Sequence, residues 1–106
     1  MTDKKLSKDN NVNLKDREKK KVQKPKKYKV VFHNDDYTPM DFVVILLVQI
    51  FRKSMEDSFN IMMAVHEKGK GIAGVYSKEI AETKSTKANE VSKASGFPLL
   101  TTIEPE

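Results

Sequence analysis

The segment YKVVFHNDDYTPMDFVVILLVQIFR, residues 28–52, contains the pattern that decides the fold. Residues 28–32 are β-branched or aromatic apart from one lysine, and they predict a strand. The asparagine, aspartates and tyrosine of residues 34–37 predict a turn. Thr38 as N-cap and Pro39 at the first helical position then predict a helix that runs to the end of the segment. Because this helix is apolar on nearly all sides, we expect it to be the central element of the core.

The rest of the chain predicts two more helices and two more strands. Ser54 is suited to cap a second helix that ends at Gly69. Its apolar stripe has helical spacing and consists of Phe59, Met62, Met63 and His66. Ser77 and Gly96 bound a third helix, whose apolar residues are Ile80, Ala81, Ala88 and Val91. With strands over 71–76 and 99–103, the order β-α-α-β-α-β predicts an α+β domain, with three helices on one face of a three-stranded antiparallel sheet.

The positive charge of the chain is confined to its start. Residues 1–27 hold eleven of the twenty Lys and Arg residues but four of the fifteen acids, a net charge of +7 against −2 for residues 28–106. The first segment has too few apolar residues to form a core, so we expect a flexible basic N-terminal extension before one folded domain, 28–106. Nucleic-acid binding requires clustered positive charge, which only this extension could supply, and we expect no nucleic-acid partner.

Composition also limits the compartment. The chain has no cysteine, which fits a reducing cytoplasm. No apolar run approaches the roughly 20 residues that cross a bilayer, and the lysines at the N-terminus are not followed by the apolar stretch of a secretory signal. We therefore expect a cytoplasmic protein with no membrane association.

The residues that could perform chemistry do not assemble into an enzyme on spacing alone. Asp35 and Asp36 could form a cation site, but adjacent acids in a turn are commonly solvated. His66 lies on an apolar stripe, where a lone histidine is usually a core residue. The methionines could fill the core or form the deformable wall of an apolar pocket. Two histidines without a third converging ligand make a weak metal site, so we expect no metal, no cofactor and no catalytic residues.

A longer pattern is more specific than any of these signals. Residues 28–30, the run Asn34 to Met40 and the pair Phe42-Val43 resemble the opening of the ClpS adaptors. The same resemblance continues through Met62, Ala64-Val65-His66, Gly69-Lys70, Gly74-Val75, residues 81–84 and Pro98-Leu99-Leu100. It extends from Tyr28 to about Glu104. Members of that family bind N-degrons, proteins whose first residue is Leu, Phe, Tyr or Trp, and deliver them to a Clp unfoldase of the ClpA or ClpC type.

The resemblance implies roles for particular residues. The polar group implied to hold the substrate's α-amino group and first peptide units is Asn34, Asp35, Asp36, Thr38 and His66. The apolar pocket implied for the first side chain is Met40, Val43, Met62, Val65 and Leu99, with Met40 as a gate. Glu79 and Lys84 match the positions that dock on the N-terminal domain of the unfoldase, although both could be exposed helix charges.

Two features depart from the family pattern, and two other functions compete with this one. His33 replaces a commonly apolar residue, and the third helix is rich in Lys, Ser and Thr around residues 84–87. The fold also resembles a domain of the bacterial ribosomal stalk protein, so a ribosome- or RNA-associated role through the basic extension is one alternative. A Clp regulator that inhibits rather than delivers is the other.

Overall fold

The computed structural model describes residues 25–106. The predicted extension over 1–27 therefore lies almost wholly outside the described residues. Within residues 25–106, three strands and three helices follow in the predicted order: β1 (Lys27–His33), α3 (Met40–Gln49), α4 (Met55–Lys68), β2 (Lys70–Ser77), α5 (Lys78–Ala94) and β3 (Leu100–Pro105). The first described strand begins at Lys27, one residue before the predicted start of the folded domain.

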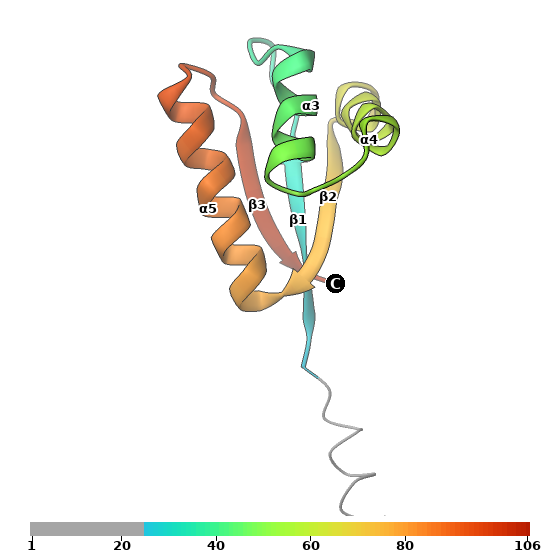
Figure 1. The fold of residues 1–106 in the computed structure, drawn as a ribbon, viewed down its shortest axis with the longest axis vertical. Coiled ribbons are helices and arrows are strands. Elements are labelled where there is room, and N and C mark those ends of the chain that lie inside the picture. The colour runs from blue at the N-terminus through green and yellow to red at the C-terminus, as the bar shows by residue number, and fades with distance from the viewer. Residues whose placement is uncertain (1–24) are drawn as a thin grey trace, which may run out of the picture.

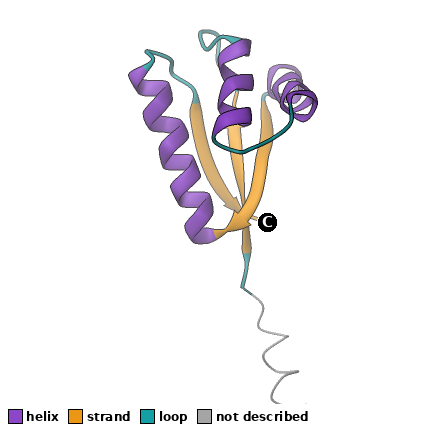
Figure 2. Cartoon of the chain, in the orientation of Figure 1, coloured by secondary structure: helices purple, strands orange, loops and turns teal. Residues whose placement is uncertain are grey.

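The sheet has the order β2-β1-β3, and β1 is antiparallel to both neighbours (Figure 1). Val30 and Phe32 alternate along β1 and are fully buried beneath the helices, with Leu47 of α3, Met62 of α4 and Ala81 of α5 in the same cluster. The period-2 alternation of a strand is the reason that these residues share a face. The prediction of an α+β domain with helices on one face of an antiparallel sheet is confirmed (Figure 2).

Helix α3 is the centre of the core, as predicted, but it is shorter than expected. It ends at Gln49, and three residues later Arg52 adopts a left-handed conformation with φ 57°. Phe51 nevertheless stays buried, with its ring edge-on to Phe32 at a centroid distance of 5.4 Å. The apolar residues after the helix therefore belong to the core without belonging to the helix.

The predicted caps of the other helices are present. Ser54 accepts a hydrogen bond from the Asp57 N–H at 3.0 Å, and Gly69 ends α4 in the left-handed conformation. Ser77 caps α5, accepting from the Ile80 N–H at a longer 3.4 Å. Two residues expected on buried faces are instead exposed: Phe59 is 54% and Ile80 49% accessible.

The buried face of α5 is formed by small residues and does not include Ile80. Ala81, Ser85, Ala88 and Ser92 are all buried and recur at the spacing of one helical face. Small side chains let the helix approach the sheet closely, and the Ser85 hydroxyl donates to the Thr101 carbonyl at 3.1 Å. The high Ser and Lys content of this helix therefore reflects a close-packed inner face and a charged outer face.

Candidate functional site

The loop between β1 and α3 is organised by Asp35. One oxygen of its carboxylate accepts from the backbone N–H groups of Tyr37 at 2.8 Å and Thr38 at 2.7 Å, and the other accepts from the Thr38 hydroxyl at 2.8 Å. Asp followed by two free N–H groups favours such a turn because the side chain replaces a backbone acceptor. Asp35 therefore fixes the shape of the loop.

These hydrogen bonds also set the ionisation of Asp35. Partial burial is the largest single influence and disfavours the charged form. The N–H groups of Thr38 and Tyr37 and the Thr38 hydroxyl together outweigh it, so the pKa of Asp35 is lowered. Asp36, by contrast, is exposed, and its carboxylate makes no hydrogen bond with another described residue.

The prediction that Thr38 is the N-cap of α3 is wrong. The N-cap is Pro39, with φ −65° and ψ 144°, and no side chain caps the helix there. The Thr38 hydroxyl instead donates to the Asp35 carboxylate. Thr38 lies one residue before the N-cap, so its side chain does not cap the helix. Because proline has no N–H, placing it at the cap leaves one fewer donor to satisfy.

Helix α4 brings His66 to this loop. The Asn34 N–H donates to the carbonyl of Gly69 at 2.9 Å, and the Gly69 N–H donates to the carbonyl of Val65 at 3.0 Å. The loop and the C-terminal end of α4 are thereby joined directly. Val65 and His66 lie within about one turn of Gly69, and Met62 lies within about two turns, so one helix supplies both apolar and polar groups to the same place.

Leu99 is positioned by the end of α5. Gly96, with φ 83°, ends that helix, and the N–H of Phe97 donates to the carbonyl of Ser92 at 2.9 Å while the N–H of Gly96 donates to that of Lys93 at 3.0 Å. This pair of bonds is a Schellman motif, which needs a left-handed residue and therefore favours glycine. The Phe97 ring packs edge-on against Phe42 of α3, 4.8 Å between centroids, and Leu99 follows it into the core.

All ten residues implied for substrate binding line one cavity of about 270 Å³. They are Asn34, Asp35, Asp36, Thr38, Met40, Val43, Met62, Val65, His66 and Leu99. The apolar members other than Met40 are at most 5% exposed, whereas Asn34, Asp36 and His66 are exposed. The cavity therefore has a buried apolar floor and an open polar rim.

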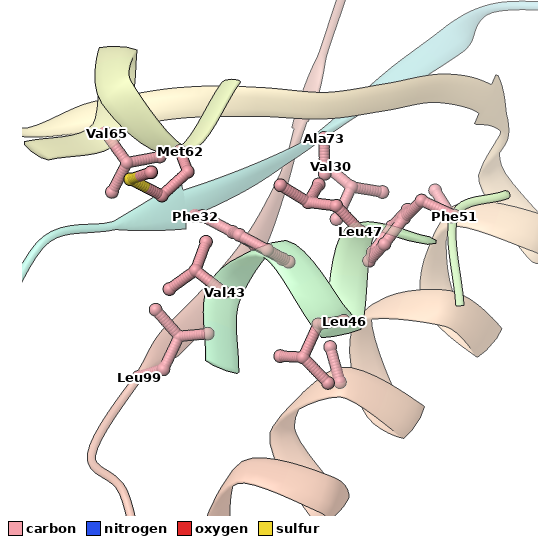
Figure 3. Close-up of a cluster of buried hydrophobic side chains, with 12 residues drawn as sticks. Val30, Phe32, Val43, Leu46, Leu47, Phe51, Met62, Val65, Ala73 and Leu99 are labelled. Carbon is pink, nitrogen blue, oxygen red and sulfur yellow. The ribbon is translucent and has the colours of Figure 1, made fainter. Parts of the chain in front are cut away.

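The floor of the cavity is continuous with the hydrophobic core. Figure 3 shows Val43, Met62, Val65 and Leu99 grouped beside Phe32, while Val30, Leu47 and Phe51 lie at the other end of the cluster. Met40, 41% exposed, begins α3 at the rim. Because the floor residues also hold the fold together, their positions are fixed before any ligand arrives.

The remaining predicted residues lie elsewhere. His33 does not line the cavity; its Nε2 is 2.7 Å from the Thr102 hydroxyl of β3. Glu79 and Lys84 lie on α5, and the Lys84 ammonium donates to the carbonyl of Ile50 at 2.7 Å. Within residues 25–106, no three His, Asp or Glu side chains converge to form a metal site. No helix in that range is long and apolar enough to cross a membrane.

Two residues outside the predicted site residues position the cavity. Gly71 of β2 lies beneath α4, and a Cβ added there would be 2.8 Å from Val65 Cγ2, so only glycine permits this approach. Asn89 of α5 uses its side-chain amide to pair with both backbone groups of Thr101, at 2.9 and 3.0 Å. The sequence predicted close backbone approach at the glycines of this strand, Gly71 and Gly74, without naming what approaches them. Nothing in the sequence pattern indicated the partner of Asn89.

Comparison with known proteins identifies the family. Residues 23–102 match the family model described as ATP-dependent Clp protease adaptor protein ClpS. The chain belongs to the ClpS family. It is accordingly an adaptor of an ATP-dependent Clp protease and not an enzyme.

One curated relative extends the match to nearly the whole chain. The ClpS adapter protein of Oleidesulfovibrio alaskensis is 47% identical over 106 residues, 98% of each chain. That of Lawsonia intracellularis is 50% identical over 84 residues, 79% of this chain and 77% of its own. A solved structure of Agrobacterium tumefaciens ClpS2 bound to L-phenylalaninamide has a TM-score of 0.76 and 44% identity, covering 78% of this chain and 100% of its own.

Proposed function

We propose that the cavity holds the first residue of substrate proteins that begin with Leu, Phe, Tyr or Trp, and that the chain delivers them to a Clp unfoldase. The observation that carries this proposal is the joining of an acceptor-rich rim and an apolar floor in one cavity. Its volume of about 270 Å³ lies just below the roughly 300–1,000 Å³ of pockets for drug-sized ligands. It therefore suits a single residue better than a longer peptide.

The rim suits an α-amino group, which distinguishes a protein's first residue from all others. A free ammonium has three donors, and the rim offers the Asn34 amide oxygen, the Asp36 carboxylate and a His66 imidazole nitrogen as acceptors. Hydrogen bonds to charged groups contribute roughly 1.5–3 kcal/mol each. Asp35 is already committed to Thr38 and Tyr37, so we assign it to holding the loop and Asp36 to the ligand.

The floor suits a large apolar side chain. Burying a Leu or Phe side chain contributes roughly 1.5–3 kcal/mol. We infer that Met40, which starts α3 and lines the cavity, narrows the opening at the level of the ligand's β-carbon and so excludes Val and Ile by crowding. L-phenylalaninamide, the ligand in the Agrobacterium ClpS2 structure, combines a free α-amino group with such a side chain.

Delivery requires a second surface. We place it on α5 around Glu79 and Lys84, for docking on the N-terminal domain of a ClpA- or ClpC-type unfoldase. Since the protease served by this family depends on ATP, we place the activity in the cytoplasm.

A panel of peptides that differ only in the first residue tests the binding proposal. Peptides that start with Leu, Phe, Tyr or Trp should bind at least tenfold more tightly than those that start with Val or Ile, measured by fluorescence anisotropy. Met40→Ala should reduce this preference by opening the cavity, with Met55→Ala, an exposed methionine outside it, as the matched control. Equal affinity across the panel would refute an apolar first-residue pocket.

A further inference from the structure

A second hollow adjoins the substrate cavity on the side of α5. It measures about 650 Å³, and its lining includes Tyr37, Lys93, Phe97, Pro98 and Leu99. Leu99 also lines the substrate cavity, and Tyr37 directly follows Asp36 of that cavity's rim. The two hollows are therefore neighbours that share one wall. We call the second one the side groove.

Strand pairing brings the two hollows together. His33, the last residue of β1, pairs with Leu100, the first residue of β3. The loop after β1 and the connection from α5 to β3 consequently lie at the same end of the sheet, at the top of the molecule in Figure 1. The first supplies the rim of the cavity and the second supplies Phe97, Pro98 and Leu99. A peptide that leaves the cavity toward α5 therefore passes over the side groove.

The floor of the side groove is fixed by bonds within the chain. The Asn89 side chain pairs with both backbone groups of Thr101, at 2.9 and 3.0 Å. The Phe97 ring is held against Phe42, 4.8 Å between centroids, and the left-handed Gly96 sets the direction in which the chain leaves α5. A surface that is already ordered loses little conformational entropy when a ligand binds.

Tyr37 and Lys93 stand at the edges of this floor. The Tyr37 side chain is 80% exposed, although its backbone N–H is held by the Asp35 carboxylate at 2.8 Å. A tyrosine on a fixed loop offers a large apolar contact area at a low cost in rotamer entropy. Lys93 is exposed in the last turn of α5. The side groove is thus an apolar and aromatic surface with one cation at its edge.

The geometry of an extended peptide decides which substrate residue reaches the side groove. Successive side chains of such a peptide point to opposite sides, and each residue advances the chain by about 3.3 Å. When the first side chain points into the cavity, the second points away from the protein. The third side chain then points back toward the surface, about 7 Å farther along. A spacing of this size fits two hollows that share the Leu99 side chain.

We propose that the side groove binds the side chain of the substrate's third residue and prefers a large apolar or aromatic one. Tyr37 and Phe97 contact that side chain, and Lys93 raises the affinity for an acidic third residue relative to a basic one. This inference rests on the proposed function, because it follows the substrate beyond the first residue that the cavity holds. It adds a second position at which the protein reads its substrates.

Peptides scanned at two positions test the groove. The affinity of the full chain is measured by fluorescence anisotropy for peptides with Phe first and glycine elsewhere. Leu, Phe or Trp at the third position should strengthen binding about fivefold by burying apolar surface, and at the second position should change it less than about twofold. Equal affinities for glycine and Phe at the third position would overturn the groove. An equal gain at the second position would overturn the assignment to the third residue.

Tyr37→Ala tests the aromatic contact. The substitution keeps the backbone N–H that holds the loop to Asp35 and removes only the ring. The ratio of affinities for third-position Phe and third-position Gly should fall to about one, because the side chain and its partner act as a pair. Phe59→Ala, an exposed aromatic on α4 that lines neither hollow, is the matched control and should keep the wild-type ratio. A wild-type ratio in Tyr37→Ala would overturn this contact.

Lys93→Glu tests the charge at the edge. The ratio of affinities for third-position Asp and third-position Lys should fall at least about threefold in this variant, and the change should shrink as salt is added. Lys78→Glu reverses an exposed charge at the first residue of α5, about 22 Å away along the helix, and should leave the ratio unchanged. The same ratio in Lys93→Glu as in wild type would overturn the role of Lys93.

The outcomes distinguish the side groove from the function on which it rests. If wild type binds the peptide with Phe first and glycine elsewhere, and no third residue changes the affinity, the groove is overturned while the first-residue cavity stands. If wild type binds no peptide with Phe first, the cavity and the groove are both overturned.

Discussion

Asp35 and Asp36 are adjacent in the sequence but have different environments. Asp35 accepts three hydrogen bonds from Tyr37 and Thr38, whereas Asp36 projects from the loop without a described partner. We expect Asp36→Asn to leave the melting temperature unchanged and to weaken binding of an N-terminal Phe peptide about tenfold, because one charge-assisted bond is lost. Asp35→Asn should lower both the melting temperature and the peptide affinity, since it disturbs the loop that carries Asn34 and Asp36. Equal effects of the two variants on stability would contradict this division of roles.

The lowered pKa of Asp35 makes loop stability depend on acid pH. Because the folded-state pKa lies below the unfolded value of 3.8, ionised Asp35 stabilises the fold fully above about pH 4 and loses this contribution as pH falls through the folded-state pKa. Urea denaturation should therefore show wild type more stable than Asp35→Asn near neutral pH. The difference should shrink below about pH 3. A difference that stays constant over this range would exclude the ionised carboxylate as its cause.

At the scale of elements, the contact between α4 and β2 determines the shape of the cavity. In Gly71→Ala the new Cβ meets Val65 Cγ2 at 2.8 Å and the Ile61 carbonyl at 3.3 Å, so α4 must shift. Overpacking of this kind costs about 1–3 kcal/mol, and we expect peptide affinity to fall with it because Val65 lines the floor. Lys70→Ala, the exposed neighbour on the same strand, is the control. Unchanged denaturation and peptide binding would show that this approach does not shape the cavity.

Sequence patterns predicted which helices and strands form better than they predicted which face of each helix is buried and where each helix begins or ends. The caps Ser54 and Ser77 were predicted because capping depends on residues close in the chain. The exposure of Phe59 and Ile80 was not predicted, because tertiary packing decides which side of a helix is covered. Thr38 was misassigned for a local reason: its hydroxyl has two possible partners close in the chain, and it donates to Asp35. The pairing of Asn89 with Thr101 joins positions twelve residues apart, which no local pattern encodes.

The molecule as a whole separates its substrate cavity from its proposed docking surface along α3. Periodicity alone left the Asn34–Asp36 turn and His66 as ordinary features, and only the resemblance to the family brought them to one site. The structure places all ten implied residues around one cavity, and Lys84 contacts the carbonyl of Ile50 at the other end of α3. We therefore expect substrate and unfoldase to bind simultaneously. The affinity for the unfoldase N-terminal domain should change less than about twofold when the cavity is saturated with an N-terminal Phe peptide, and mutual exclusion would contradict separate surfaces.

The central claim is that the cavity recognises a free α-amino group together with a large apolar side chain. The most direct measurement is a titration of one peptide with N-terminal Phe, before and after acetylation of its amino group. Acetylation removes the charge and two of the three donors but keeps the side chain. Since each hydrogen bond to a charged group contributes roughly 1.5–3 kcal/mol, the account predicts at least a tenfold loss of affinity. Equal affinity of the free and acetylated peptides would contradict it.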